Sequence, residues 1–153
     1  MHDAALAEAL EAERGRPGAL LPVLHAVQDR LGHVPPDAVP RIAAALNVSR
    51  ADVQGVISFY SDFRSAPPAR HVLRFCMAEA CLSRGAATLQ QQAMRRLGIG
   101  AQGRTADGAV ELEPVYCLGN CACSPSLTLD GRLHGRVSAA ALDALLDELG
   151  LAS

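Results

Sequence analysis

The sequence of 153 residues has no Trp and no Lys, and its aromatic side chains are two Tyr and three Phe. Proteins usually hold single-stranded nucleic acid by stacking its bases on aromatic side chains, so this composition argues against such a role. The net charge is −2. That value also argues against binding nucleic acid or an anionic membrane through positive charge alone.

Long apolar runs are also missing, because the longest ones are short and broken by Pro or Gly. None can form the helix of about 20 residues that spans a bilayer. The first residues, Met1-His2-Asp3, lack the basic and apolar pattern of a secretory signal. We therefore expect a cytoplasmic protein without a membrane-inserted segment. Disulfides are rare in that compartment, so the five Cys residues are interpreted as ligands or redox thiols.

Residues 1–66 show apolar residues at helical spacing, and we expect a helical bundle there. The expected helices lie around Leu6 and Leu10, from Pro17 to Gly32, from Pro36 to Leu46, and from Ser49 to Tyr60. Ser49 and Asp52 form an acidic variant of the capping box. The segment Arg64-Ser-Ala-Pro-Pro-Ala-Arg70 interrupts every periodicity. We take it as the boundary between two parts, residues 1–66 and 67–153.

Residues 67–153 alternate between strand and helix patterns. Strands are expected at 71–75 and 110–115, and a hairpin at 127–134 because Asp130-Gly131 is a favoured two-residue turn. Helices are expected at 83–97, with Ser83 as N-cap, and from Ser138 onward. The order strand, helix, strand, hairpin, helix predicts an α/β domain with a parallel βαβ unit, which is the thioredoxin-like arrangement.

Two pairs of Cys residues follow the two longer strands, as Cys76-x4-Cys81 and Cys117-x3-Cys121. Parallel strands end at the same edge of a sheet, so we expect the pairs on facing loops. A tetrahedral zinc site, a [2Fe–2S] cluster and unligated thiols all remain open on this spacing. The Cys-x-x-Cys spacing of a redox dithiol does not occur.

The composition of the loops favours the cluster. Four thiolates around an oxidised [2Fe–2S] core carry a net charge of about −2, so the site needs N–H donors and few carboxylates. Leu118-Gly119-Asn120 can turn its amides toward sulfur, and no acidic residue occurs between 114 and 129. Glu79 in the first loop is the exception.

The remaining candidate ligands are weaker. Cys123, two residues beyond Cys121, is interpreted as a small buried side chain beside the site, with a substitute ligand as the alternative. The five His residues are scattered without ligand spacing, so a His-ligated cluster is not expected. No Ser/His/Asp arrangement and no phosphate-binding glycine loop is present, so we expect an electron carrier without an active site of its own.

A different class of function is suggested by residues 39–58, which have the spacing of a helix-turn-helix. An iron–sulfur redox-sensing transcription factor would share that feature. However, residues 1–66 carry six Arg against eight Asp and Glu, and the segment that would enter the groove offers only Arg50 beside Asp52. DNA affinity depends largely on phosphate neutralisation, so this is a distant alternative and no nucleic-acid partner is expected.

Three segments resemble one family: Leu21-Pro-Val-Leu-His-Ala-Val-Gln-Asp29, Val53-Gln-Gly-Val-Ile-Ser-Phe-Tyr60 and Cys117-Leu-Gly-Asn-Cys121. It is the thioredoxin-like [2Fe–2S] subunit of complex I, of NAD-reducing hydrogenases and of soluble NAD-dependent formate dehydrogenases. The resemblance covers nearly the whole chain. Its Cys-x4-Cys…Cys-x3-Cys motif implies one [2Fe–2S] cluster, with the family's ligands falling on Cys76, Cys81, Cys117 and Cys121.

The wording Phe75-Cys-Met-Ala-Glu-Ala-Cys81 and Asn120-Cys-Ala-Cys-Ser-Pro125 is most similar to the gamma subunit of formate dehydrogenases. That resemblance implies exchange of single electrons with the FMN of a partner subunit that also binds NAD. It further implies iron–sulfur subunits leading to a molybdenum formate-oxidising subunit. The equivalent subunit of complex I or of an NAD-reducing hydrogenase is the alternative. One departure from many complex I members is Ala122 followed by Cys123, where they have Gly after the fourth ligand.

The motif predicts that the purified protein is brown and contains about two irons and two labile sulfides per chain. After reduction, it should give a rhombic paramagnetic signal from one unpaired electron. Iron and sulfide analysis and electron paramagnetic resonance test this. A colourless protein with one zinc per chain would contradict it.

Overall fold

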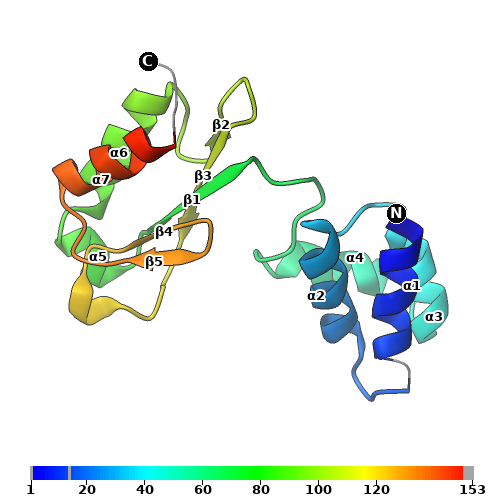
Figure 1. Cartoon of the computed structure of the whole chain (residues 1–153). Coiled ribbons are helices and arrows are strands. Elements are labelled where there is room, and N and C mark those ends of the chain that lie inside the picture. The colour runs from blue at the N-terminus through cyan, green and yellow to red at the C-terminus, as the bar shows by residue number, and fades with distance from the viewer. Residues whose placement is uncertain (1, 14, 150–153) are drawn as a thin grey trace. The chain divides into compact units, whose positions relative to one another are not determined.

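The computed structural model describes residues 2–13 and 15–149. The chain divides into two compact units, one up to Pro68 and the other from Ala69 (Figure 1). The division lies inside the segment from Arg64 to Arg70, where the helical periodicity of the sequence ends.

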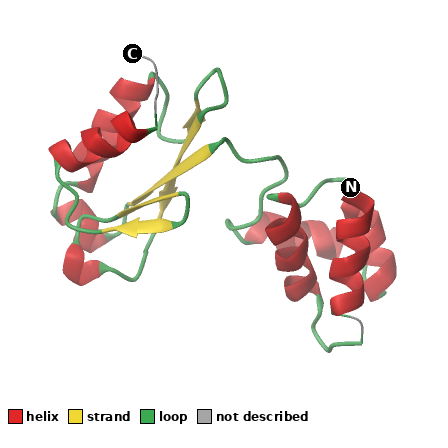
Figure 2. Cartoon of the chain, viewed as in Figure 1, coloured by secondary structure: helices red, strands yellow, loops and turns green. Residues whose placement is uncertain are grey.

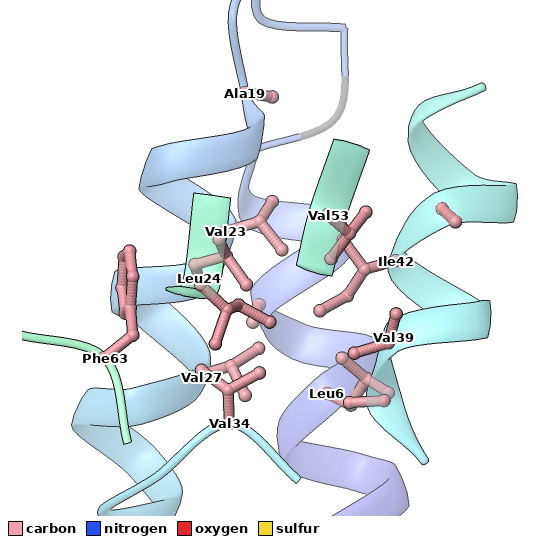
Figure 3. Packing of buried hydrophobic residues seen from close by; sticks show 14 residues of the cluster. Leu6, Ala19, Val23, Leu24, Val27, Val34, Val39, Ile42, Val53 and Phe63 are labelled. Carbon is pink, nitrogen blue, oxygen red and sulfur yellow. The ribbon is translucent and has the colours of Figure 1, made fainter. Parts of the chain in front are cut away.

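The first unit consists of helices, as the sequence predicts. They are α1 (His2–Ala12), α2 (Leu20–Leu31), α3 (Ala38–Leu46) and α4 (Arg50–Phe59). Figure 3 shows side chains from all four helices pointing into a common centre, among them Leu6, Val23, Ile42 and Val53. These residues recur at helical spacing in the sequence, so one apolar face of each helix is buried.

Glycines and a capping box set the helix ends. Helix α2 begins at Leu20 and not at Pro17, because Gly18 has a φ of +70° that no helix accommodates. Gly32, at φ +76°, ends α2 as predicted. Ser49 caps α4: its hydroxyl accepts from Asp52 N at 3.0 Å, and the Asp52 carboxylate accepts from Ser49 N at 3.0 Å. These hydrogen bonds hold the pKa of Asp52 below its usual value.

The segment after α4 is held against α2 by one glutamine. Gln28 Nε2 donates to the Asp62 carbonyl at 2.6 Å, and Gln28 Oε1 accepts from Arg64 N at 2.8 Å. Phe63 stacks near the ring of His25, with 4.9 Å between the ring centroids. The chain therefore stays packed on the bundle until it reaches the second unit's first strand.

The second unit contains a five-stranded sheet in the order β2-β3-β1-β4-β5. The strands are β1 (His71–Cys76), β2 (Gly103–Arg104), β3 (Val110–Val115), β4 (Leu127–Leu129) and β5 (Arg132–His134). β1 and β3 pair in parallel, and the other pairs are antiparallel. The hairpin turn is as predicted, with positive φ at both Asp130 and Gly131. Strand β2 is not predicted by the sequence, because two residues show no periodicity.

Helices cover this sheet. They are α5 (Glu79–Ser83), α6 (Ala86–Leu97) and α7 (Ala139–Glu148), with a short 3₁₀ helix at Cys121–Cys123. Helices α6 and α7 lie side by side against the sheet (Figure 2). The expectation of a single helix from Ser83 is wrong: Ser83 ends α5, and Gly85 at φ +92° separates it from α6. The predicted strand, helix, strand, hairpin, helix order is confirmed.

Across residues 2–13 and 15–149, no helix combines the length and the apolar character needed to cross a membrane.

Each unit has its own core, and this predicts separate responses to core substitutions. Ile42 lies fully buried in the first core and Leu112 in the second. Replacing either by Ala should lower the free energy of unfolding by roughly 2–5 kcal/mol, because buried carbon is removed and a cavity remains. Hydrogen exchange should then show Ile42→Ala loosening α1–α4 while β1 and β3 stay protected, and Leu112→Ala doing the reverse. Loss of protection in both units from either change would contradict this.

Candidate metal centre at the sheet edge

The parallel pairing of β1 and β3 brings the two cysteine loops to one edge of the sheet. Cys76 is the last residue of β1 and lies opposite Val115, the last residue of β3. Met77 N donates to the Val115 carbonyl at 2.7 Å, so the pairing continues one residue into the first loop. Cys117 follows two residues after Val115. The expectation that both loops leave from the same edge is therefore confirmed.

The first pair of cysteines is buried. Cys76 is 3% exposed and Cys81, on α5, is 2% exposed, and both pack against Ala86. Burial raises the pKa of the Cys76 thiol, which also hydrogen-bonds to Cys81; the N–H groups of Ala78 and Leu118 partly oppose this rise. Leu118 belongs to the second loop, so a backbone amide of one loop already faces a sulfur of the other.

Cys81 has a different environment. Burial raises its pKa, but hydrogen bonds from the Ser124 hydroxyl, the Cys76 thiol and Ser126 outweigh burial and leave the pKa below its usual value. Cys81 Sγ lies 3.6 Å from Ser124 Oγ. Thiolates are the form that binds metals, so the surroundings of Cys81 favour the ligating form.

The second pair is exposed. Cys117 and Cys121 both lie at the surface, and Cys121 begins the 3₁₀ helix. Gly119 N donates to Cys117 Sγ at 3.3 Å, in a turn where Gly119 has a φ of +70°. The amides of Leu118 and Gly119 thus face sulfur, as the sequence of the loop predicts.

A polar network holds the second loop in place. Asn120 Nδ2 donates to Ser126 Oγ at 3.1 Å, and Ser126 Oγ donates to the Cys123 carbonyl at 3.1 Å. The same carbonyl accepts from Arg136 N at 2.6 Å. A Cβ on Gly135 would lie 2.6 Å from Asn120 Nδ2, so only glycine fits there without displacing the loop.

Sequence reasoning missed Asn120, Ser124, Ser126 and Gly135. The available signal was the unusual density of small polar residues in Asn120-Cys-Ala-Cys-Ser-Pro-Ser126, whose chemistry depends on the fold. The sequence predicts a buried Cys123, but this residue is only half-buried, because it lies on the outer turn of the 3₁₀ helix. Its contribution to the network is its carbonyl oxygen.

The donor set fits a [2Fe–2S] cluster. Four thiols arrive from two loops at one edge, N–H groups approach two of the sulfurs, and the second loop has no carboxylate. The structure brings Cys76 and Cys81 into contact with each other, and Leu118 and Ser124 link that pair to the loop that bears Cys117 and Cys121. Among the described residues, no three His, Cys, Asp or Glu side chains form a ready site for a single metal ion.

Known proteins share this sequence. Residues 6–150 match the family model of the thioredoxin-like [2Fe-2S] ferredoxins. The chain is 40% identical over 119 residues to a subunit of the NADH-quinone oxidoreductase of Pseudomonas aeruginosa, covering 78% of this chain and 72% of that protein. It is 35% identical over 129 residues to the subunit of the same name from Escherichia coli, covering 84% and 78%.

One solved structure shares the fold over nearly the whole length. The match is to the crystal structure of an NAD+-reducing [NiFe]-hydrogenase in the air-oxidized state, with a TM-score of 0.75 and 27% identity. It covers 90% of this chain and 24% of the hydrogenase chain, so this chain spans about a quarter of that protein.

The five cysteines predict a clear division between ligands and a bystander. Replacing Cys76, Cys81, Cys117 or Cys121 by Ala should abolish or severely deplete bound iron, because each change removes a thiolate bond. Cys123→Ser should keep the iron content near wild type and serves as the matched control. Iron analysis of the purified variants measures this. If Cys123→Ser loses iron while Cys121→Ser retains it, the fourth ligand is wrongly assigned.

Proposed function

The chain belongs to the thioredoxin-like [2Fe–2S] ferredoxin family, and we propose that it is the electron-transfer subunit of an NADH-quinone oxidoreductase or a related NAD-linked complex. The observation that carries this proposal is the convergence of two cysteine loops at the end of the parallel strands β1 and β3. The extent of the match to the NADH-quinone oxidoreductase subunits of two bacteria supports the type of complex.

In this proposal, Cys76, Cys81, Cys117 and Cys121 hold one [2Fe–2S] cluster, which supplies one-electron redox chemistry when bound. The chain's own residues do the rest. Packing around Cys76 and Cys81 excludes water from one side of the site. The amides of Leu118 and Gly119 stabilise the negative charge on sulfur. The chain makes and breaks no substrate bond in this role.

The exposed side of the site supports a partner protein. Cys117 and Cys121 lie at the surface, and Tyr116 beside them leaves 76% of its area exposed. A large aromatic side chain next to a redox site is a favourable contact for a docked protein. A shuttle protein usually relies on strong surface charge for transient docking, whereas this chain has a net charge of −2. We therefore propose a permanent subunit beside a partner that binds FMN and NAD.

The parent complex has two candidates. The two bacterial relatives described above are NADH-quinone oxidoreductase subunits, and the structural match is to an NAD+-reducing hydrogenase, so both favour this group over formate dehydrogenase. The formate dehydrogenase gamma subunit, with a molybdenum partner subunit, stays the second candidate. It is carried by the wording from Phe75 to Cys81 and from Asn120 to Pro125 alone.

The proposal predicts that the chain co-purifies in fixed stoichiometry with an FMN- and NAD-binding subunit, and that this association persists at high salt because it is packed and not steered by charge. NADH should reduce the cluster only when that partner is present. Analytical gel filtration in high salt and optical titration with NADH measure both. A free monomer that a soluble reductase reduces directly would place the chain among the shuttles.

The native complex also separates the parent assemblies. NADH-dependent quinone reduction without formate or hydrogen activity would support the quinone oxidoreductase. Formate-dependent or hydrogen-dependent NAD reduction would replace it by the corresponding alternative.

A further inference from the structure

Ser124 touches both cysteine pairs. Its hydroxyl oxygen lies 3.6 Å from Cys81 Sγ and 2.7 Å from the carbonyl oxygen of Cys121. Ser124 is only 7% exposed. A buried hydroxyl between a candidate ligand of the first loop and one of the second is therefore in a position to act on the site itself.

The hydrogens at this contact can be accounted for one by one. With Cys81 as a thiol, its S–H donates to Ser124 Oγ, and the single hydroxyl hydrogen of Ser124 donates to the Cys121 carbonyl. A ligating thiolate has no hydrogen to give. The contact with Cys81 then persists as a hydrogen bond only if the Ser124 hydroxyl turns toward sulfur.

That rotation leaves no carbonyl without a donor. The Cys121 carbonyl also accepts from Ser124 N at 3.3 Å, so it keeps a partner when the hydroxyl turns away. The usual cost of an unpaired buried acceptor is thus avoided. Ser124 can donate to sulfur without breaking the turn that carries Cys121.

We propose that Ser124 is a positioning residue that donates a hydrogen bond to the ligand sulfur of Cys81 and thereby raises the reduction potential of the bound cluster. This inference rests on the proposed function, since it requires Cys81 to ligate a [2Fe–2S] cluster. Reduction adds one electron, breaks no bond and makes the thiolate-ligated site more negative. A donor to sulfur stabilises that extra charge, and hydrogen bonds to sulfur are among the features that set cluster potentials.

Ser126 does not offer the same separation of roles. Its hydroxyl donates to the Cys123 carbonyl and accepts from Asn120 Nδ2, so its removal would also loosen the loop. Ser83 provides the matched control. Its hydroxyl, at the end of α5, donates to the Ala80 carbonyl at 3.0 Å.

The experiment uses the full chain, reconstituted with iron and sulfide, as wild type, Ser124→Ala, Ser124→Thr and Ser83→Ala. Iron and sulfide content come first, and a wild-type protein that assembles no [2Fe–2S] cluster contradicts the proposed function itself. With the cluster assembled, redox titration followed by electron paramagnetic resonance gives the midpoint potential. Resonance Raman spectra report the iron–thiolate stretching bands.

We expect Ser124→Ala to retain iron near the wild-type content, to titrate at a more negative potential and to shift an iron–thiolate band. Ser124→Thr keeps the hydroxyl and should titrate like wild type, as should Ser83→Ala. The inference is overturned if Ser124→Ala keeps the wild-type potential, if it loses its iron, or if Ser124→Thr behaves like Ser124→Ala.

Discussion

The parallel pairing of β1 and β3 is the constraint on which the rest of the second unit depends. Six residue pairs, from His71 with Val110 to Cys76 with Val115, fix the two strands in one register. The bond from Met77 N to the Val115 carbonyl carries this register into the loops. Residues that are 41 positions apart in sequence, Cys76 and Cys117, therefore leave the sheet together. Helices α6 and α7 cover the sheet and keep it rigid.

Gathering thiolates at one place creates a charge that the surroundings must compensate. The chain does so with amides and hydroxyls and without basic side chains at the sulfurs: Leu118 and Gly119 supply N–H groups, and Ser124 supplies a hydroxyl. Such donors work only when the loop is held still. The close approach of Gly135 and the bonds of Asn120 and Ser126 provide that rigidity.

Much of the fold follows from local patterns in the sequence. Apolar periodicity indicated the helices of the first unit, and Asp130-Gly131 indicated the hairpin. The break at Gly85 could not be predicted, because glycine permits a positive φ without requiring it. The four candidate ligands followed from spacing and family resemblance. The network of Asn120, Ser126 and Gly135 did not, because these residue types are common in loops and acquire their partners only when the hairpin folds back.

The register between β1 and β3 also restricts how this gene can change in length. One residue gained or lost between Val110 and Cys117 would displace Cys117 by about 3.3 Å along the strand direction and turn the preceding side chains to the opposite face. Changes of length in the exposed turn around Ala106 and Asp107 leave that register untouched. Insertions and deletions in descendants of this chain are therefore confined by the sheet to segments such as that turn, which is also where a reporter peptide would be tolerated.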